Sequence, residues 1–166
     1  MTTSQRGFTL IEVMIATMVL TIGVLGTYAL ISRVITATSV SVSQLTASYL
    51  AQEGLELVRN ARDTNFLRIR QGEEIEWTDG LLTCSSGCEV DYNDAAFDSY
   101  QGRFLKATGS FYAYDSGEDT KFKREVTITQ PSANALEIFV DVSWQDRGNI
   151  SREVQAADKL YNWYTP

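Results

Sequence analysis

The stretch FTLIEVMIATMVLTIGVLGTYALISRVI, residues 8–35, decides the fold, because only Glu12 and Arg33 within it carry a charge. A helix that crosses a membrane needs about 20 apolar residues, since each adds about 1.5 Å to a span of about 30 Å. A secretory signal peptide has a shorter apolar region, of about 7–15 residues, and ends in a small-residue cleavage site. We therefore expect a membrane-spanning helix. The basic residues 1–7 should stay in the cytoplasm, and the chain beyond Arg33 should be exported.

The composition of the whole chain hides this segment and argues against catalysis. The 166 residues are 44% apolar and 21% charged, values that would suit one soluble domain. The mean hydropathy of −0.14 averages an apolar segment with a polar remainder. The chain has no histidine, the usual general base and metal ligand near neutral pH. We therefore expect no enzyme, no catalytic residue, no cofactor and no metal site.

The net charge of −7 is concentrated in one acidic stretch between Gln71 and Gly102, which contains no Lys or Arg. Its acids are Glu73, Glu74, Glu76, Asp79, Glu89, Asp91, Asp94 and Asp98. Such a stretch repels phosphate groups, so we expect no nucleic acid partner unless a local basic patch forms. The candidates for that patch are Lys121, Lys123 and Arg124. The simplest interpretation of the acidic stretch is a solvated loop region.

Calcium binding is the alternative role for part of the acidic stretch. The oxygen ligands available are Asp91, Asn93, Asp94 and Asp98. An EF-hand loop counted from Asp91 would need a glycine at its sixth position and a glutamate at its twelfth. The residues there are Ala96 and Gly102. Only an irregular calcium site remains open.

Glu12 is the anomaly in the apolar segment. A carboxylate within a membrane helix costs about 2.5–3.5 kcal/mol on insertion scales, which points to a function and a partner. The alternative is a glutamate near the membrane surface that extends into water. The neighbouring residues separate the two interpretations: Arg6-Gly7-Phe8-Thr9-Leu10-Ile11-Glu12-Val13. This motif resembles the prepilin processing site of type IV pilins and of the pseudopilins of type II secretion.

The resemblance implies a processing site and an assembly role. Gly7 would be the last residue of a leader, residues 1–7, and a prepilin peptidase would cut after it. Phe8 would become the methylated amino terminus. Glu12 would pair with the terminal amine of a neighbouring subunit and set the axial register of a filament. The implied location is the bacterial inner membrane with a single pass, and then an extracellular or periplasmic filament. The implied partners are the peptidase and other pilins or pseudopilins, contacted through the helix.

The helix should continue beyond the membrane. Apolar or small residues recur at Leu50, Gly54, Leu57 and Ala61, a helical spacing that predicts a stripe facing a core. We expect one helix from Phe8 to about Arg62, with residues 8–35 as its membrane half and 36–68 as its amphipathic half. Glu53 and Glu56 would lie on its solvated face.

Two further stretches sharpen the resemblance. Residues 22–26 (Ile-Gly-Val-Leu-Gly) and 51–60 look like segments of minor pilins, in particular of the PilV group. The two glycines are either tolerated in an ordinary membrane helix or allow close helix packing.

Residues 69–166 should form an exported head built on antiparallel sheet. Strict alternation of apolar residues predicts a strand over 136–145, flanked by strands over 122–130 and 150–157, with another possible over 110–114. Turns are expected over 131–134 and 146–149. The fold class is α+β, with the sheet packed on the long helix, and it resembles the pilin head.

The two cysteines, Cys84 and Cys88, predict a disulfide, since an exported chain with an even count favours one. Three intervening residues including a glycine allow the turn that brings the sulfurs together; free thiols are the alternative. An aromatic tail of Tyr161, Trp163 and Tyr164 either packs on the core or forms an exposed contact patch.

These features favour a structural subunit, a minor pilin that enters or primes a type IV pilus. A minor pseudopilin of type II secretion is the close alternative. A pilus-tip adhesin or ligand-binding subunit on the same anchor is an alternative of another class.

Overall fold

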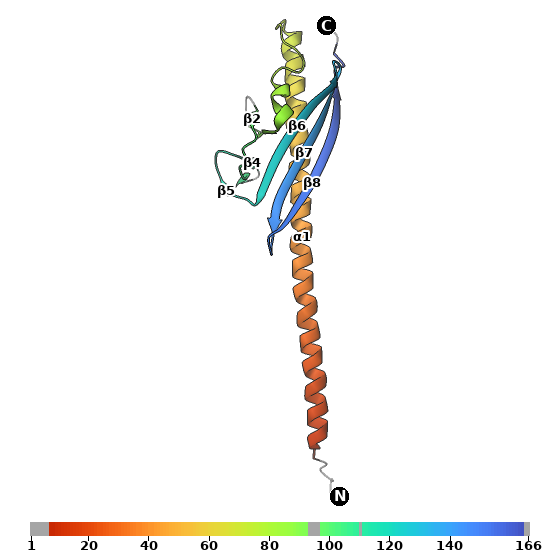
Figure 1. Ribbon diagram of the computed structural model, residues 1–166. Helices are drawn as coiled ribbons and strands as arrows, with labels where there is room; N and C mark the ends of the chain where they lie inside the picture. The colour runs from red at the N-terminus through yellow and green to blue at the C-terminus, as the bar shows by residue number, and fades with distance from the viewer. Residues whose placement is uncertain (1–6, 93–96, 110, 165–166) are drawn as a thin grey trace, which may run out of the picture. The chain divides into compact units, whose positions relative to one another are not determined.

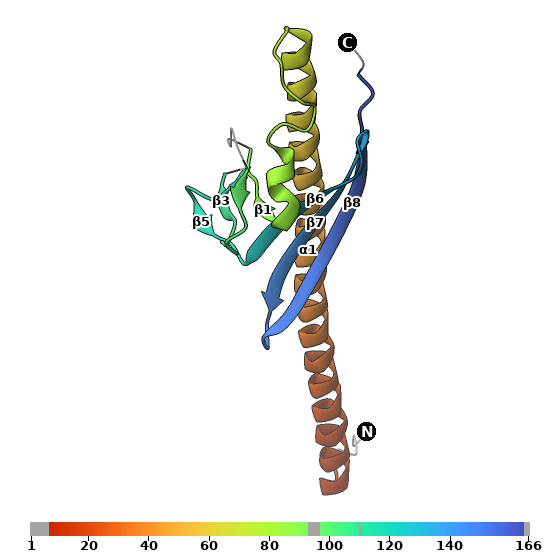
Figure 2. The same ribbon diagram turned by 45° about the horizontal axis from the view of Figure 1, so that its top comes forward.

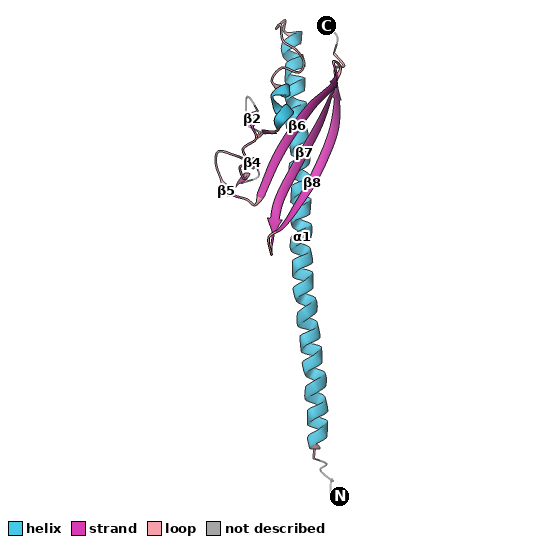
Figure 3. Ribbon diagram, in the orientation of Figure 1, coloured by secondary structure: helices cyan, strands magenta, loops and turns pink. Residues whose placement is uncertain are grey.

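The computed structural model describes residues 7–92, 97–109 and 111–164, as two compact units over 1–42 and 43–166. The helical elements are α1 (Leu10–Arg70) and the 3-10 helix η1 (Leu81–Ser86). The strands are β1 (Cys88–Glu89), β2 (Asp98–Ser99), β3 (Lys106–Thr108), β4 (Phe111–Ala113), β5 (Glu118–Asp119), β6 (Phe122–Ser132), β7 (Ala135–Asp146) and β8 (Ile150–Tyr161). A long helix with antiparallel sheet confirms the α+β class (Figure 3). Residues 1–6 of the predicted leader, Asn93 and Asp94 of the calcium set, and Ser110 lie outside the described residues.

Helix α1 begins two residues after Phe8 and ends eight residues beyond Arg62. Its extra turns belong to the head, because Asn65 and Phe66 are buried there. The helix ends in a Schellman motif: the amide of Glu73 donates to the carbonyl of Arg68 at 3.1 Å, and Gly72 has φ +92°. A glycine adopts that backbone conformation without the strain that a Cβ would bring. The predicted end near Arg62 is therefore about two turns short, whereas the boundary at residue 68 lies two residues before the observed end.

The larger sheet has the order β2-β1-β6-β7-β8, with antiparallel pairing throughout. Three long consecutive strands, β6, β7 and β8, form its meander and cross the second half of α1 (Figure 1). They contain the three predicted strands but are longer. β6 continues through Pro131 to Ser132, where the register is irregular, so the turn is confined to Ala133 and Asn134. A proline has no amide hydrogen to donate to a ladder, which explains the irregularity.

A second, smaller sheet has the order β4-β3-β5 and lies on the β1 side of the larger sheet, away from β8 (Figure 2). β4 occupies the described part of the predicted strand over 110–114. The other very short strands and η1 were not expected. They lie between the end of α1 and the start of β6, where β1 and β2 extend the larger sheet and β3 and β5 belong to the smaller one.

The core of the head lies between α1 and the larger sheet. Helix residues Ala47, Leu50 and Val58 are buried, as are Ile138 and Val140 of β7. Gly54 permits this packing, because a Cβ there would lie 2.8 Å from Cγ1 of Val140.

The buried stripe of α1 differs from the predicted one by a partial rotation. Leu50 and Gly54 are buried as predicted, but Leu57 and Ala61 are only half-buried at its edge. Val58 and Arg62 take the central positions instead. The helix therefore presents a small-residue face to the sheet, and the larger Leu57 packs at the side.

Candidate processing and assembly site

The bond between Gly7 and Phe8 lies before the first turn of α1, in backbone without regular structure. Phe8 is 84% exposed, and a Cβ at Gly7 would meet no atom within 4 Å. A peptidase must bind its substrate backbone closely, and a non-helical, uncrowded glycine makes that approach possible. The local structure therefore leaves this bond accessible.

Thr9 caps the helix immediately after that bond. Its hydroxyl oxygen accepts a hydrogen bond from the amide of Glu12 at 3.3 Å, and its carbonyl accepts from the amides of Glu12 and Val13 at 3.1 and 3.2 Å. Thr9 and Glu12 have the spacing of a capping box, in which a glutamate three residues after the cap supports the helix start. The Thr9 side chain therefore fixes the point at which helix α1 begins.

The Glu12 side chain is exposed and makes no ion pair with any described residue. A carboxylate surrounded by apolar side chains is costly unless an opposite charge pairs with it. The position therefore requires either water at the membrane surface or a cation from another molecule.

The first half of α1 exposes its apolar side chains on all sides. Each large apolar residue from Leu10 to Ile35 is at least 53% exposed. This helix is long and apolar enough to cross a membrane. Threonine hydroxyls within it donate to carbonyls of the preceding turn, as from Thr21 to Thr17 at 2.7 Å and from Thr27 to Gly23 at 2.8 Å. These hydroxyls are satisfied without water, as a lipid environment requires.

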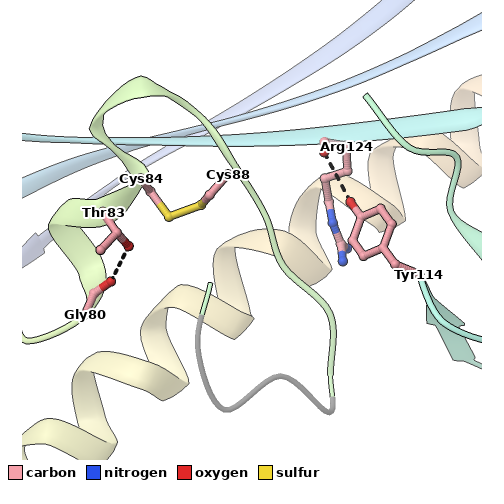
Figure 4. Close-up of a disulfide and its surroundings, with 6 residues drawn as sticks. All are labelled: Gly80, Thr83, Cys84, Cys88, Tyr114 and Arg124. Carbon is pink, nitrogen blue, oxygen red and sulfur yellow. Dashed lines mark hydrogen bonds between the residues drawn. A yellow bond between two sulfur atoms is a disulfide. The ribbon is translucent and has the colours of Figure 1, made fainter. Parts of the chain in front are cut away.

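In the head, Cys84 and Cys88 are joined in a disulfide with their Cα atoms 4.9 Å apart (Figure 4). Both cysteines are buried. Gly87, with φ +90°, ends η1 between them, and its amide donates to the carbonyl of Cys84 at 3.1 Å. The bridge fastens η1 to the start of β1.

The acidic stretch is not uniformly solvated, so the expectation of a solvated loop region is wrong for two of its members. Glu89 is fully buried, accepts hydrogen bonds from the amides of Gln101 and Arg103 at 3.1 and 2.8 Å, and pairs with the Arg103 guanidinium. Asp91 is 3% exposed and accepts from the amide of Tyr114 at 3.0 Å. These two carboxylates hold Gln101, Arg103 and Tyr114 to the end of β1 and the residues that follow it.

The residues described from the possible calcium set do not converge on a site. Asp91 is engaged in the hydrogen bond above, and Asp98 pairs with Arg103 at 3.0 Å. Within residues 7–92, 97–109 and 111–164, no three acids or cysteines are grouped so that they could hold a metal ion.

The basic patch considered as a possible nucleic acid site, made of Lys121, Lys123 and Arg124, does not form. Arg124 is fully buried, and its Nη1 atom donates to the carbonyl of Leu50 at 3.1 Å and to Glu53 at 3.2 Å. The Nη2 atom bonds the carbonyl of Val90. Lys121 pairs with Asp146 at 2.7 Å. Only Lys123 of the three candidates remains for an outside anion.

Arg124 is also the residue that sequence reasoning missed. It joins β6 to α1 and to the end of β1, and its carbonyl accepts the hydroxyl of buried Tyr114 at 3.2 Å (Figure 4). Burial raises the pKa of Tyr114 to about 12, so this hydroxyl stays protonated as a donor. The available signal was a charged residue on the apolar face of an alternating strand. Glu53, placed on the solvated helix face, is half-buried against Arg124 instead.

The aromatic tail combines the two roles considered for it. Trp163 is 65% exposed, yet its ring lies 4.8 Å from that of Phe66 on α1. Tyr164 is half-buried at 5.9 Å from the same ring, and Tyr161 is 56% exposed. The tail therefore packs on the end of α1 and still presents aromatic surface.

Comparison with known proteins finds one family model, the prokaryotic N-terminal methylation motif, over residues 2–28. No curated protein and no solved structure matches the chain. The matched residues contain Gly7, Phe8 and Glu12. The match supports a protein of the prepilin type over these residues, and helix α1, long and apolar enough to cross a membrane, agrees with it.

Proposed function

We propose that this chain is a minor pilin that enters, or primes assembly of, a type IV pilus. The observation that carries the proposal is the first half of α1, whose large apolar side chains are all exposed. Apolar surface of this extent is stable only when lipid or other helices cover it. A single pass through the inner membrane before assembly, and a bundle of subunit helices afterwards, would supply both coverings.

In this proposal, residues 1–7 are a leader removed by prepilin peptidase, and Phe8 is then methylated. Residues 8–35 anchor and assemble, 36–68 carry the head on the same helix, and 69–166 complete the head. The resemblance of residues 22–26 to the PilV group favours a minor subunit over the major one.

Cleavage after Gly7 would place a positive terminal amine four residues before Glu12. The amine of one subunit and the Glu12 carboxylate of its neighbour would neutralise each other within the apolar bundle, which fixes the axial register. Removing one partner of a buried ion pair typically costs about 3–5 kcal/mol. Loss of Glu12 should therefore affect assembly and leave the head folded.

Co-expression with a prepilin peptidase tests the processing step. Mass spectrometry of the membrane-extracted protein should show a chain that begins at Phe8 and carries one added methyl group. Gly7→Val is the matched control, and its Cβ branch should block cleavage. An intact leader on the wild-type chain, with the peptidase active on its own substrate, would refute the processing proposal.

Assembly is tested in a bacterium that makes pili, with Glu12→Gln compared against Gln52→Ala on the exposed face of the same helix. Sheared pili should contain the wild-type chain and the Gln52 variant, and should lack the Glu12 variant. Equal incorporation of Glu12→Gln would contradict the ion-pair role. Recovery of the wild-type chain only in a periplasmic secretion filament would assign it to the pseudopilins.

A further inference from the structure

A groove of about 540 Å³ lies over the larger sheet where β6 begins and β7 ends. Its floor includes Lys123 of β6 and Ser143 of β7, which are paired across the two strands. Both alternate with residues buried against α1, so their side chains project from the opposite face of the sheet. Phe104 forms one wall and is 47% exposed. The volume falls within the range of small-molecule sites, about 300–1,000 Å³.

The groove contains a cation with no counter-ion in the described part of the chain. The Nζ atom of Lys123 lies 4.6 Å from the centre of the Phe104 ring, and no described carboxylate pairs with it. Lys121 at the edge of the groove is already paired with Asp146. Asp119 also lines the groove and is exposed, so Lys123 provides the positive charge beside the Phe104 ring in a groove that contains one carboxylate as well.

Three further polar side chains of the groove are available to a ligand. Ser143, Gln145 and Ser151 line it, and their side chains make no hydrogen bond with any described residue. Thr120, by contrast, donates its hydroxyl to the carbonyl of Leu105 at 2.6 Å. Two hydroxyls and an amide near one ammonium group match a ligand that carries several hydroxyls and a carboxylate.

A second hollow in the head, of about 360 Å³, has no unpaired cation among its lining residues. Its arginine, Arg68, is paired with Glu73 at 2.8 Å and with Asp79 at 3.4 Å. A charged ligand there would have to displace an existing partner. The groove over the sheet is therefore the better candidate.

We propose that this groove binds an acidic saccharide, a sugar ring that carries a carboxylate. The Lys123 ammonium donates to the carboxylate, and the Phe104 ring packs against the C–H face of the sugar. Ser143, Gln145 and Ser151 bond its hydroxyls. An acidic peptide would also supply a carboxylate, but it lacks the hydroxyls that these side chains match. The inference goes beyond the filament role and does not require leader cleavage.

Isothermal titration calorimetry on the full chain in detergent micelles tests the proposal, with trigalacturonate as the probe and maltotriose as the neutral control. We expect trigalacturonate to bind at least tenfold more tightly than maltotriose, and added salt to weaken the binding. Lys123→Met should lower the affinity for trigalacturonate at least tenfold. Lys106→Met, outside the groove, should leave it unchanged. The near-ultraviolet circular dichroism of each variant verifies that the head is folded.

Three outcomes would overturn the inference. Absence of trigalacturonate binding would remove the site, and equal affinity of the wild-type chain and folded Lys123→Met would remove the role of the ammonium. Triglutamate that binds as tightly as trigalacturonate would assign the groove to acidic peptides. Each result is independent of whether the chain enters a pilus, so the two proposals fail separately.

Discussion

Arg124→Ala should be among the most destabilising substitutions in the head. The guanidinium is fully buried and bonds the carbonyls of Leu50 and Val90, and it also pairs with Glu53. Its aliphatic stem packs against the backbone of α1 at Gly54, where a Cβ would lie 3.2 Å from its Cδ atom. Truncation would therefore remove a polar connection among three elements and leave a cavity.

The magnitude follows from these contacts. Each hydrogen bond from a charged donor contributes about 1.5–3 kcal/mol. Removing one partner of a buried ion pair costs about 3–5 kcal/mol, but the Glu53 side chain is 30% exposed and water would replace part of its interaction. We therefore expect Arg124→Ala to lower the free energy of unfolding by about 4 kcal/mol. Arg124→Met keeps most of the volume and should lose about 2 kcal/mol.

Urea denaturation of the full chain in detergent micelles, followed by tryptophan fluorescence, measures these differences. The buried indoles of Trp77 and Trp144 report on the head. Arg147→Ala, in an exposed turn, is the matched control and should change the free energy of unfolding by less than about 0.5 kcal/mol. The reasoning would be refuted by a loss below about 1.5 kcal/mol for Arg124→Ala. Equal losses for Glu53→Gln and Arg124→Ala would also refute it, because the hydrogen bonds from Arg124 to the two carbonyls would then contribute nothing.

Three further perturbations test the packing, the charges and the disulfide of the head. Gly54→Val should lower the free energy of unfolding by about 2–3 kcal/mol, because its side chain would overlap Val140, and urea denaturation measures it. Burial and the adjacent Asp141 raise the pKa of Glu125, so its charge opposes folding at neutral pH. Glu125→Gln should therefore raise the urea midpoint at pH 7, and the gain should disappear as the pH falls below about 4, where the unfolded carboxyl is also protonated. Reduction of the disulfide at Cys84 should cost about 2 kcal/mol or less, since the closed loop is short.

Each of these expectations has its own control and contrary result. Gln52→Ala, on the exposed side of α1, is the control for Gly54→Val and should change the free energy of unfolding little. An equally small effect of Gly54→Val would show that the close-packing argument is wrong. A gain for Glu125→Gln that is the same at acid and neutral pH would show that side-chain charge is not its source. Reductant should have no effect on the stability of a Cys84→Ala, Cys88→Ala double variant. A persisting effect would show that the reductant does not act through this disulfide.

The long helix could be predicted because its signals are local. The apolar run of residues 8–35 is uninterrupted except at Glu12 and Arg33, and the helix covers it from Leu10 onward. An end near Arg62 is too early although Phe66, Ile69 and Gly72 mark a longer helix, because the polar residues Arg62 and Asn65 interrupt the apolar stripe. The stability of the last turns comes from burial of Phe66 and from Asn65, which donates to the carbonyls of Trp77 and Asp79 at 3.2 and 2.8 Å. Those partners are distant in sequence.

The meander could be predicted for the same reason. β7 buries every second residue from Leu136 to Trp144, all of them apolar, and its neighbours are joined to it by short turns. The strands between η1 and β6 have two or three residues each, too few for any periodicity to appear. Their pairing depends on contacts across the fold and not on their own composition.

The acidic stretch shows how contacts between residues distant in sequence can make a prediction from local sequence wrong. Local reasoning assigns a run of carboxylates to solvent, because an isolated charge is costly to bury. Glu89 is nevertheless fully buried, since two backbone amides and the Arg103 side chain, 12 to 14 residues along the chain, bond it. Asp91 is held by an amide 23 residues away. These amides would otherwise be donors without strand partners. The two acids thus replace the regular ladder that the segment lacks, and a count of charges along the sequence contains no sign of it.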